Sequence, residues 1–463
     1  MTVATLFFEV LSALLWHDNM LRRMESITLQ VHADGRWRDA MVVSFDSPGD
    51  SLRSRCNINY VPEYLADQFI QLGTVKAPAV SANLPLEWEI RRELAPAFLH
   101  DIIPAGAARR HILSRMAVPP GMSIDLFLLY QFASAPIGNM RVKSAGETLY
   151  PTGKVPDGAT RAEVVQEGMG FLDQARESGM PIDGALGVGG QAKKMLLVED
   201  AAGRLYPDGA VGDAVACRHW FVKFPRNNGT KLDRDILHSE YCFYRALGAL
   251  GIDTIAAEGL TYEAAKVPSI WMQRFDRKVS PCGVERIAVE SMYSLCGVTN
   301  SVVRMDHIDV VDRLAKTWIA ADQESEIPDM ISEYLRRDLI NLIVGNTDNH
   351  CGNLSILRSK ERVSFAPVYD LAPMVLDVEG IVRITRWPTA MERFGSVDWA
   401  AVCSGFAHWA DPQWLFDRLK ADAQLLLALP DLLSELGLPQ QVWRSPLIPL
   451  SRLENTFRSW KLK

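Results

Sequence analysis

The part of the chain after residue 25 opens with short segments in which apolar and polar residues alternate, the clearest being Ile27-Thr-Leu-Gln-Val31. Because successive side chains of a strand point to opposite faces, this alternation predicts a half-buried strand. Residues 94–116 and 125–132 instead carry apolar side chains at helical spacing. We therefore expect a small α+β unit between residue 26 and about residue 142.

Two loop-rich zones follow, residues 146–160 and 178–190, with glycines and prolines that interrupt regular structure. After them, Met195-Leu-Leu-Val198 and Trp220-Phe-Val-Lys-Phe224 predict strands, and residues 235–250 predict a helix. A second unit built on a sheet is expected here.

Beyond Trp271 the pattern becomes mostly helical, with apolar spacing in residues 288–297, 310–321 and 331–345 and in several stretches from Trp399 to the end. This change from sheet to helix predicts a two-lobed α+β protein. Many other two-domain proteins share the same change, so the pattern does not by itself define a function.

The composition indicates a folded chain of several units. With 463 residues, of which 48% are hydrophobic, the chain can bury a large core and form about two to four structural units. The predicted division has four parts: residues 1–25 as an N-terminal helix or extension, 26–150 as a first subdomain, 151–275 as a small lobe, and 276–463 as a helical lobe.

Charge and cysteine content narrow the function classes. A net charge of −7 repels phosphate backbones, so we expect no direct binding of nucleic acid. The 7 cysteines include no Cys-x-x-Cys pair, which favours free thiols in a reducing cytoplasm. The apolar residues 1–16 include Glu9 and are too few to span a bilayer, so we expect a packing helix or an upstream extension and no membrane association.

The strongest chemical signal is Asn341-Leu-Ile-Val-Gly-Asn-Thr-Asp-Asn-His-Cys-Gly-Asn353, where an apolar helix leads into a polar loop. Phosphoryl transfer needs a carboxylate that accepts the hydroxyl proton and an amide oxygen that holds magnesium, and protein kinases place them at the spacing of Asp348 and Asn353. Further on, Val363-Ser-Phe-Ala-Pro-Val-Tyr-Asp370 ends a predicted strand with a second carboxylate. The three oxygen donors suit Mg²⁺, and turn capping by these residues is the alternative.

Lys223 lies inside the apolar segment 220–225, where a buried charge needs a partner. Nucleotide phosphates would supply it, and Glu240 on the following helix would hold the amine. A solvent-facing lysine and a surface Glu240 are the alternatives. The segment Gly187-Val-Gly-Gly-Gln-Ala-Lys-Lys194 places glycines before two lysines, which suits phosphates, and it is equally typical of a flexible connector.

Together these motifs resemble the HipA family, serine/threonine kinases that act as toxins of bacterial toxin-antitoxin modules, over roughly residues 26–410. Gly345-Asn-Thr-Asp-Asn-His-Cys-Gly-Asn353 resembles the family's G-N-x-D-x-H-x-x-N catalytic loop, and Tyr369-Asp370-Leu371 its Y-D-L metal motif. Trp220-Phe-Val-Lys-Phe-Pro225 resembles its ATP-lysine strand, and Gln273-Arg-Phe-Asp-Arg277 the E-R-F-D-R segment at its nucleotide hinge. The N-terminal segment Phe98-Leu-His-Asp-Ile-Ile-Pro104 is similar to a less specific F-x-x-x-L-L-P helix.

The resemblance implies a kinase-like fold with an additional N-terminal subdomain and a mostly helical C-terminal lobe, and it implies ATP and Mg²⁺ as cofactors. It makes Asp348 the general base, and Asn353 and Asp370 the metal ligands. The implied nucleotide-binding residues are Lys193, Gly189 and Gly190 in the phosphate-facing loop, Lys223 and Glu240 at the phosphates, and Gln273, Arg274 and Phe275 beside the adenine. His350 is expected to orient the loop by hydrogen bonds.

Leu186 departs from the family pattern. The family loop reads S-x-x-G-x-Q-x-K, and Gly189, Gln191 and Lys193 fit its last three fixed positions, so its serine falls on Leu186. In the family this serine is autophosphorylated to switch the kinase off. A leucine has no hydroxyl, so this alignment excludes inactivation at that position, and Ser178 is the candidate substitute.

The leading hypothesis is a HipA-type kinase in the bacterial cytoplasm that phosphorylates a protein. The resemblance implies a translation component as the target and a small helix-turn-helix antitoxin as a partner, and an acidic chain suits a basic companion. A small-molecule kinase of related fold is one alternative, against which the additional N-terminal unit speaks. A non-catalytic partner of a DNA-binding antitoxin is the other, against which the intact Lys223, Asp348 and Asp370 speak.

Overall fold

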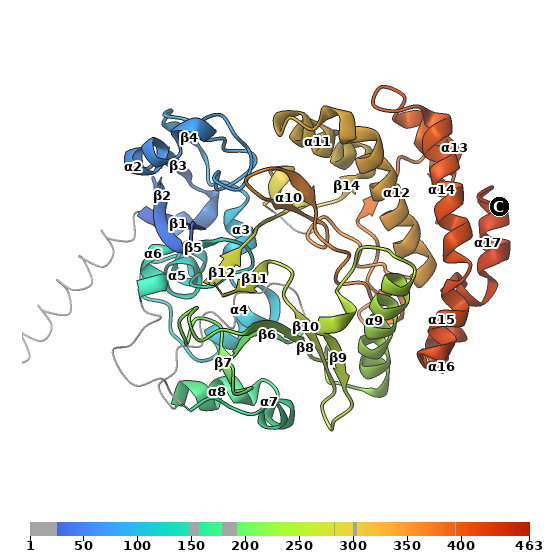
Figure 1. Ribbon diagram of the computed structural model, residues 1–463, viewed down its shortest axis with the longest axis horizontal. Helices are drawn as coiled ribbons and strands as arrows, with labels where there is room; N and C mark the ends of the chain where they lie inside the picture. Colours follow the sequence, from blue (N-terminus) through green and yellow to red (C-terminus); the bar gives the residue numbers. More distant parts are fainter. Residues whose placement is uncertain (1–25, 148–156, 178–191, 282, 300–302, 394) are drawn as a thin grey trace, which may run out of the picture.

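The computed structural model describes residues 26–147, 157–177, 192–281, 283–299, 303–393 and 395–463. We divide the chain seen in Figure 1 into an N-terminal unit (described residues of 26–147), a small lobe (157–275) and a large lobe (276–463). Within the described residues, no helix has the length and apolar character needed to cross a membrane.

The N-terminal unit is built on a five-stranded antiparallel sheet in the order β4-β3-β2-β1-β5. Its strands are β1 (Ser26–Ala33), β2 (Arg36–Phe45), β3 (Arg55–Tyr60), β4 (Arg91–Leu94) and β5 (Met140–Val142), and its helices are α2 (Pro62–Asp67), α3 (Leu99–Ile102), α4 (Gly106–Leu113), α5 (Ile124–Phe132) and α6 (Lys143–Glu147). Ile27, Leu29 and Val31 of β1 are buried, which confirms the strand that their spacing predicts.

The small lobe contains a second five-stranded antiparallel sheet, in the order β7-β6-β8-β10-β9. Its strands are β6 (Lys194–Glu199), β7 (Leu205–Pro207), β8 (Arg218–Lys223), β9 (Leu260–Glu263) and β10 (Ser269–Gln273), and its helices are α7 (Arg161–Glu167), α8 (Gly170–Glu177) and α9 (Lys231–Ala249). The two predicted strands and the predicted helix are thus present. Helix α9 begins at a capping box, in which the Thr230 side chain accepts a hydrogen bond from Asp233 N and Asp233 accepts from Thr230 N.

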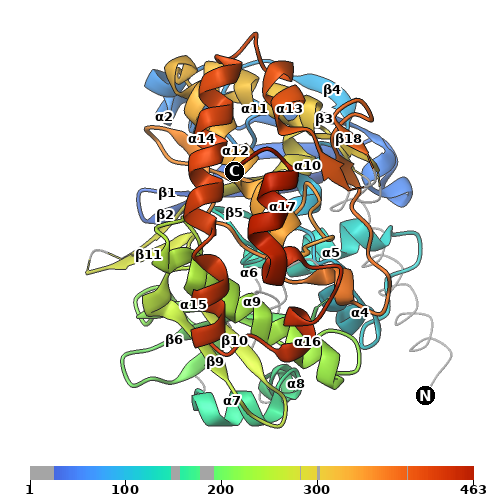
Figure 2. The same cartoon turned by 90° about the vertical axis from the view of Figure 1, so that its right-hand side faces the viewer.

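The large lobe is mostly helical, as the sequence predicts. Its helices are α10 (Met292–Leu295), α11 (His307–Ala320), α12 (Ile327–Val344), α13 (Trp399–Gly405), α14 (Pro412–Leu426), α15 (Leu429–Glu435), α16 (Gln440–Trp443) and α17 (Leu453–Ser459). Figure 2 shows α13 to α17 as an outer layer in front of α9, α11 and α12.

The prediction of a helix over residues 288–297 is wrong in its first half. Ala288–Ser291 forms strand β13, which pairs with β15 (Ser355–Arg358), and β15 pairs with β16 (Val363–Phe365). Glu290 of this strand is buried, and Arg358 of the neighbouring strand β15 pairs with its carboxylate. A buried acid with a partner on a distant strand cannot be recognised from local spacing.

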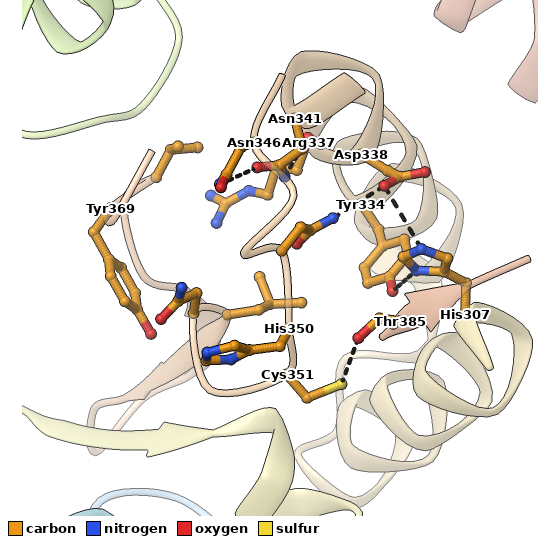
Figure 3. Close-up of a pocket in the computed structure, with 14 residues that line it drawn as sticks. His307, Tyr334, Arg337, Asp338, Asn341, Asn346, His350, Cys351, Tyr369 and Thr385 are labelled. Carbon is orange, nitrogen blue, oxygen red and sulfur yellow. Dashed lines mark hydrogen bonds and ion pairs between the residues drawn. The ribbon is translucent and has the colours of Figure 1, made fainter. Parts of the chain in front are cut away.

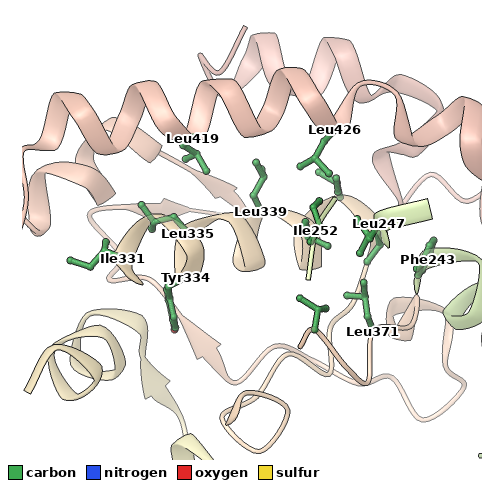
Figure 4. Close-up of a cluster of buried hydrophobic side chains, with 14 of the residues drawn as sticks. Phe243, Leu247, Ile252, Ile331, Tyr334, Leu335, Leu339, Leu371, Leu419 and Leu426 are labelled. Carbon is green, nitrogen blue, oxygen red and sulfur yellow. The ribbon is translucent and has the colours of Figure 1, made fainter. Parts of the chain in front are cut away.

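One apolar core joins the large lobe to α9. Leu335 and Leu339 of α12 face Leu419 and Leu426 of α14, as Figure 4 shows, and all four side chains are buried. Positions four residues apart lie on one face of a helix, so α12 presents a continuous apolar stripe to α14. The same core includes Leu371, the residue that follows Asp370 in the chain.

Arg358 ties the large lobe to the N-terminal unit. Its guanidinium is fully buried and donates hydrogen bonds to the carbonyl oxygens of Ala79 and Val80 at 2.8 and 3.0 Å. Its ion-pair partner Glu290 accepts a hydrogen bond from Ser81 Oγ at 2.5 Å. Because a buried charge pair is costly to break, these contacts hold the N-terminal unit against the strands that lead into the candidate site.

Candidate active site

Helix α12 ends where the polar loop of residues 346–353 begins. Gly345 caps the helix in the left-handed conformation, with a φ of 71°. A Cβ at this glycine would lie 2.8 Å from Ile448 and 2.9 Å from Val375, so the position is also closed to larger side chains. The backbone N of Asn346 then donates to the carbonyl oxygen of Asn341 at 2.9 Å. The point at which the loop leaves the helix is therefore fixed.

Asparagine side chains hold this loop together. Asn346 Nδ2 donates to Asn341 Oδ1 at 2.8 Å, and Asn346 Oδ1 accepts from the backbone N of Asp348 at 3.2 Å. Asn353 Nδ2 donates to the carbonyl oxygen of Asp348 at 3.0 Å. Asn346 Nδ2 also lies 3.4 Å from the carbonyl oxygen of Asp370. The loop and the segment of Asp370 are thus joined, as the two adjacent motifs predict.

The Asp348 carboxylate is half-buried, and two basic side chains flank it. His350 Nε2 lies 3.6 Å from Oδ1, and Arg226 Nη1 lies 3.7 Å from Oδ2. Burial raises the pKa of Asp348 above its ordinary value, with a further increase from the charge of Asp370. His350 and Arg226 oppose this increase without cancelling it. A carboxylate with a raised pKa is a better proton acceptor.

His350 is held within the loop by its own hydrogen bond. Its Nδ1 accepts from the backbone N of Gly352 at 3.0 Å, and its ring stacks on Tyr293 with centroids 5.7 Å apart. Gly352 approaches so closely that a Cβ there would lie 2.9 Å from the imidazole. These contacts fit the loop-orienting role expected of His350.

Lys223, at the end of β8, is buried between two carboxylates. Its Nζ lies 2.5 Å from Glu240 Oε2 on α9, and it also contacts Asp370 Oδ1. Burial alone would lower the pKa of this amine, but Asp370 and Glu240 outweigh burial and hold the pKa above its ordinary value. The Tyr244 hydroxyl donates to the second oxygen of Glu240 at 2.8 Å. The structure therefore joins Lys223 with Glu240, as the sequence predicts, and also with Asp370.

Asp370 has a strained backbone and a fully ionised side chain. Its φ of 53° lies in the left-handed region, which costs a residue with a Cβ about 1–3 kcal/mol. Burial would raise the pKa of its carboxyl, but Lys194 and Lys223 hold that pKa well below its usual range. On one side the Tyr369 hydroxyl contacts Ser355 Oγ at 2.6 Å, and on the other Leu371 is buried in the core. These neighbours hold the carboxylate toward the two lysines.

Two residues of this site were missed from the sequence. Lys194 of β6 is the cross-strand partner of Lys223, so both side chains share one face of the sheet, and its Nζ lies 3.4 Å from Asp370 Oδ2. Lys194 directly precedes the predicted strand of residues 195–198, and only the pairing of β6 with β8 shows that it belongs to the strand. Arg226 follows the ATP-lysine motif, and no local signal connects it with Asp348.

The predicted hinge residues lie in different environments. Gln273 is exposed at the end of β10, and the ring of Phe275 stacks on that of Tyr369 with centroids 5.9 Å apart. The guanidinium of Arg274 is buried and paired with Asp208 and Asp276. Phe275 brings the hinge next to the segment of Asp370, and contact with adenine stays a prediction for all three residues.

The phosphate-facing loop is described only at its end. Gly189, Gly190, Gln191, Leu186 and Ser178 lie outside the described residues. Lys193 is exposed, and its carbonyl oxygen accepts a hydrogen bond from Phe224 N at 2.9 Å. The role of the Lys193 side chain stays a prediction.

A small pocket lies between α12 and the loop of residues 346–353 (Figure 3). It is lined by His307, Tyr334, Arg337, Asp338, Asn341, Asn346, Asn349, His350, Cys351, Asn353, Leu354, Val368, Tyr369 and Thr385. Asp338 accepts hydrogen bonds from Asn349 Nδ2 at 3.1 Å and from Trp387 Nε1 at 2.8 Å. Burial lowers the pKa of the neighbouring His307 to about 4, so this imidazole is neutral at neutral pH. Residues of both α12 and the loop line this pocket.

Asn353 and Asp370 carry amide and carboxylate oxygens, the kind of ligand that Mg²⁺ takes when it is bound together with a nucleotide. Mg²⁺ takes about six oxygen ligands, commonly one or two from the protein and the rest from phosphates and water. Among the described residues there is no group of three or more His, Cys, Asp or Glu side chains that could hold a metal ion. Asn353 and Asp370 would therefore act with phosphate oxygens.

A sheet-containing small lobe, a helical large lobe and a lysine–carboxylate site between them define the class of two-lobed, kinase-like α+β proteins. A family model described as HipA-like C-terminal domain matches residues 186–421, about half of the chain, and the chain belongs to this family. No curated protein sequence matches the chain.

The chain is also similar in structure to solved proteins. HipA from the Shewanella oneidensis MR-1 toxin-antitoxin complex of HipA, HipB and operator DNA is similar, with a TM-score of 0.62 and 16% identity over 94% of this chain and 100% of that chain. The Helicobacter pylori proinflammatory kinase CtkA has a TM-score of 0.36 and 12% identity, over 58% of this chain and 89% of that chain. The match to HipA confirms the predicted fold, including the additional N-terminal subdomain.

Proposed function

We propose that this chain is an ATP- and Mg²⁺-dependent serine/threonine protein kinase of the HipA type. The observation that carries the proposal is the arrangement around Lys223, whose buried amine bridges Glu240 and Asp370. Asp370 is in turn connected through Asn346 to the loop that carries Asp348. Phosphoryl transfer requires a cation that binds the nucleotide phosphates, oxygen ligands for magnesium and a proton acceptor. Lys223, Asp370 and Asp348 are proposed for these roles.

In the proposed reaction, Lys223 binds ATP phosphates while Glu240 holds its amine in place. Asn353 and Asp370 would hold Mg²⁺, which neutralises phosphate charge when bound. Asp348 accepts the proton of the substrate hydroxyl, and its raised pKa suits this role. His350 and Asn346 keep the carboxylate directed toward the substrate by fixing the loop around it.

The target and the partners belong to the same proposal. We infer a protein substrate in the bacterial cytoplasm, a translation component by family resemblance, and a small helix-turn-helix antitoxin as partner. The Shewanella HipA structure, which contains HipB and operator DNA, supports the antitoxin. The net charge of −7 favours DNA contact through that partner, and a mobility-shift assay with and without it tests this expectation.

Transfer of radiolabelled phosphate from γ-labelled ATP to proteins of a bacterial lysate tests the activity. The wild type is expected to label protein, and Asp348→Asn to reduce the rate by about a hundredfold or more. Asp417→Asn, in an exposed position of α14, is the matched control and should label like the wild type. Equal labelling by Asp348→Asn removes Asp348 from the mechanism, and labelling of a small alcohol without protein labelling identifies a small-molecule kinase instead.

A further inference from the structure

Arg226 lies just after β8, with a guanidinium that is largely buried among three carboxylates. Its side chain is 11% exposed. Its Nε lies 3.1 Å from Asp377 Oδ2, and its Nη2 lies 3.0 Å from Glu379 Oε2. Its Nη1 lies 3.7 Å from Oδ2 of Asp348. One cation of the small lobe is therefore placed beside the proposed base of the large lobe.

The three contacts differ in kind. Asp377 is fully buried, and Glu379 follows it on the segment that begins at Asp370, so both can anchor the guanidinium. Their distances are those of direct ion pairs, whereas the distance to Asp348 exceeds a normal hydrogen bond. Guanidinium is a rigid planar fork, so the charge contacts of Nε and Nη2 with Asp377 and Glu379 leave Nη1 as the nitrogen nearest to Asp348.

The positive charges of this site lie beside two different carboxylates, Asp370 and Asp348. Lys223 and Lys194 both contact Asp370, on the side where the nucleotide phosphates are expected. Arg226 stands at Asp348, where the substrate hydroxyl must lie within about 2.6–3.2 Å of the carboxylate. A group in this position reaches the oxygens of a phosphoryl group that is moving toward that hydroxyl.

We propose that Arg226 is a catalytic residue that donates hydrogen bonds to the phosphoryl group during its transfer, an inference that rests on the proposed kinase function. In this step the bond between the γ-phosphorus and its bridging oxygen breaks, and ADP leaves with the electron pair. The bond between phosphorus and the hydroxyl oxygen forms, and the hydroxyl proton passes to Asp348. Arg226 transfers no proton; it stabilises charge on the phosphoryl oxygens, as arginines do in other phosphoryl transfers.

Steady-state kinetics of Arg226→Gln and Arg226→Lys test the proposal. We expect kcat of Arg226→Gln to fall by about a hundredfold or more with KM for ATP unchanged, because the interaction forms in the transition state. Arg226→Lys should recover only part of the rate, because an ammonium lacks the planar fork. Arg218→Ala, which removes an exposed ion pair with Glu199 at the other end of β8, is the control and should leave kcat unchanged.

A second variant separates the effect of Arg226 on kcat from its effect on the stability of the fold. Arg226→Gln leaves the buried Asp377 without its cation, which can destabilise the fold. The double variant Arg226→Gln/Asp377→Asn removes that charge too, so thermal stability should recover while kcat stays low. Recovery of kcat in the double variant, or a wild-type kcat in Arg226→Gln, overturns the proposal while the kinase function stands. A wild type that transfers no phosphate overturns both.

Discussion

Lys194 and Lys223 are cross-strand partners in β6 and β8, and both amines contact the carboxylate of Asp370. Adjacent antiparallel strands place paired residues on the same face of a sheet, so the pairing itself brings the two charges together. Asp370, in turn, comes from the large lobe. The two lobes are therefore joined by ion pairs at the point where nucleotide phosphates are expected.

This relationship predicts that Lys194 contributes more to nucleotide binding than Lys193. Lys194→Ala removes a cation from Asp370 and should weaken Mg-ATP binding about tenfold, an effect of about 1.4 kcal/mol. Lys193→Ala, at the neighbouring exposed position, is the matched variant. Isothermal titration calorimetry measures the affinity of both variants for Mg-ATP. It thereby compares Lys193, which the family loop implies, with Lys194, which contacts Asp370. A larger loss for Lys193→Ala favours the family alignment and contradicts our account.

Glu240→Gln should destabilise the protein and lower its activity, because Lys223 then keeps only one of its two carboxylates. We expect a loss of about 1–3 kcal/mol in the free energy of unfolding by chemical denaturation. Tyr244→Phe removes a hydrogen bond to Glu240 without changing charge, and should cost about 1 kcal/mol or less. If the two variants lose the same free energy, the charge of Glu240 has no special part in holding Lys223.

Leu339→Ala should lower the free energy of unfolding by about 2–5 kcal/mol, because it opens a cavity between α12 and α14. The side chain is fully buried in the core shown in Figure 4. Leu425→Ala, on α14 but 40% exposed, changes the same atoms in a less packed position and should cost clearly less. Urea denaturation of both variants measures the difference, and equal losses would show that α12 does not pack as described.

Asp101→Asn should change how stability depends on pH. Burial raises the pKa of Asp101 to about 7, although two hydrogen bonds from Ser291 lower it in part. The folded state therefore holds this proton more tightly than the unfolded state, and the stabilisation is lost as pH rises from about 4 toward 7. The melting temperature of the wild type relative to that of Asp101→Asn should thus fall as pH rises from about 4 to about 7. A constant difference contradicts the raised pKa.

The parts of the fold that depend on local spacing could be predicted from the sequence. The helix before the catalytic loop is one example, because its apolar residues and the terminal Gly345 are neighbours in the chain. Strand β13 could not be predicted, because the burial of Glu290 depends on an ion pair with Arg358 of a distant strand. Pairing between distant segments decides which face such a residue takes.

The site shows the same division. Asp348, Asn353 and Asp370 stand in two compact motifs, so the sequence alone can propose them. The contact of Lys194 with Asp370 depends on the register between β6 and β8, which a local pattern does not contain. The place of Arg226 depends on acidic residues far along the chain, which a local pattern cannot reveal.

Binding of Mg-ATP by the wild type, Asp370→Asn and Asp348→Asn, measured by isothermal titration calorimetry, tests the central assignment most directly. If Asp370 holds magnesium and Asp348 accepts the proton, Asp348→Asn should bind Mg-ATP like the wild type. Asp370→Asn should lose the dependence of binding on magnesium. No binding by the wild type, or equal weakening in the two variants, would contradict the assignment.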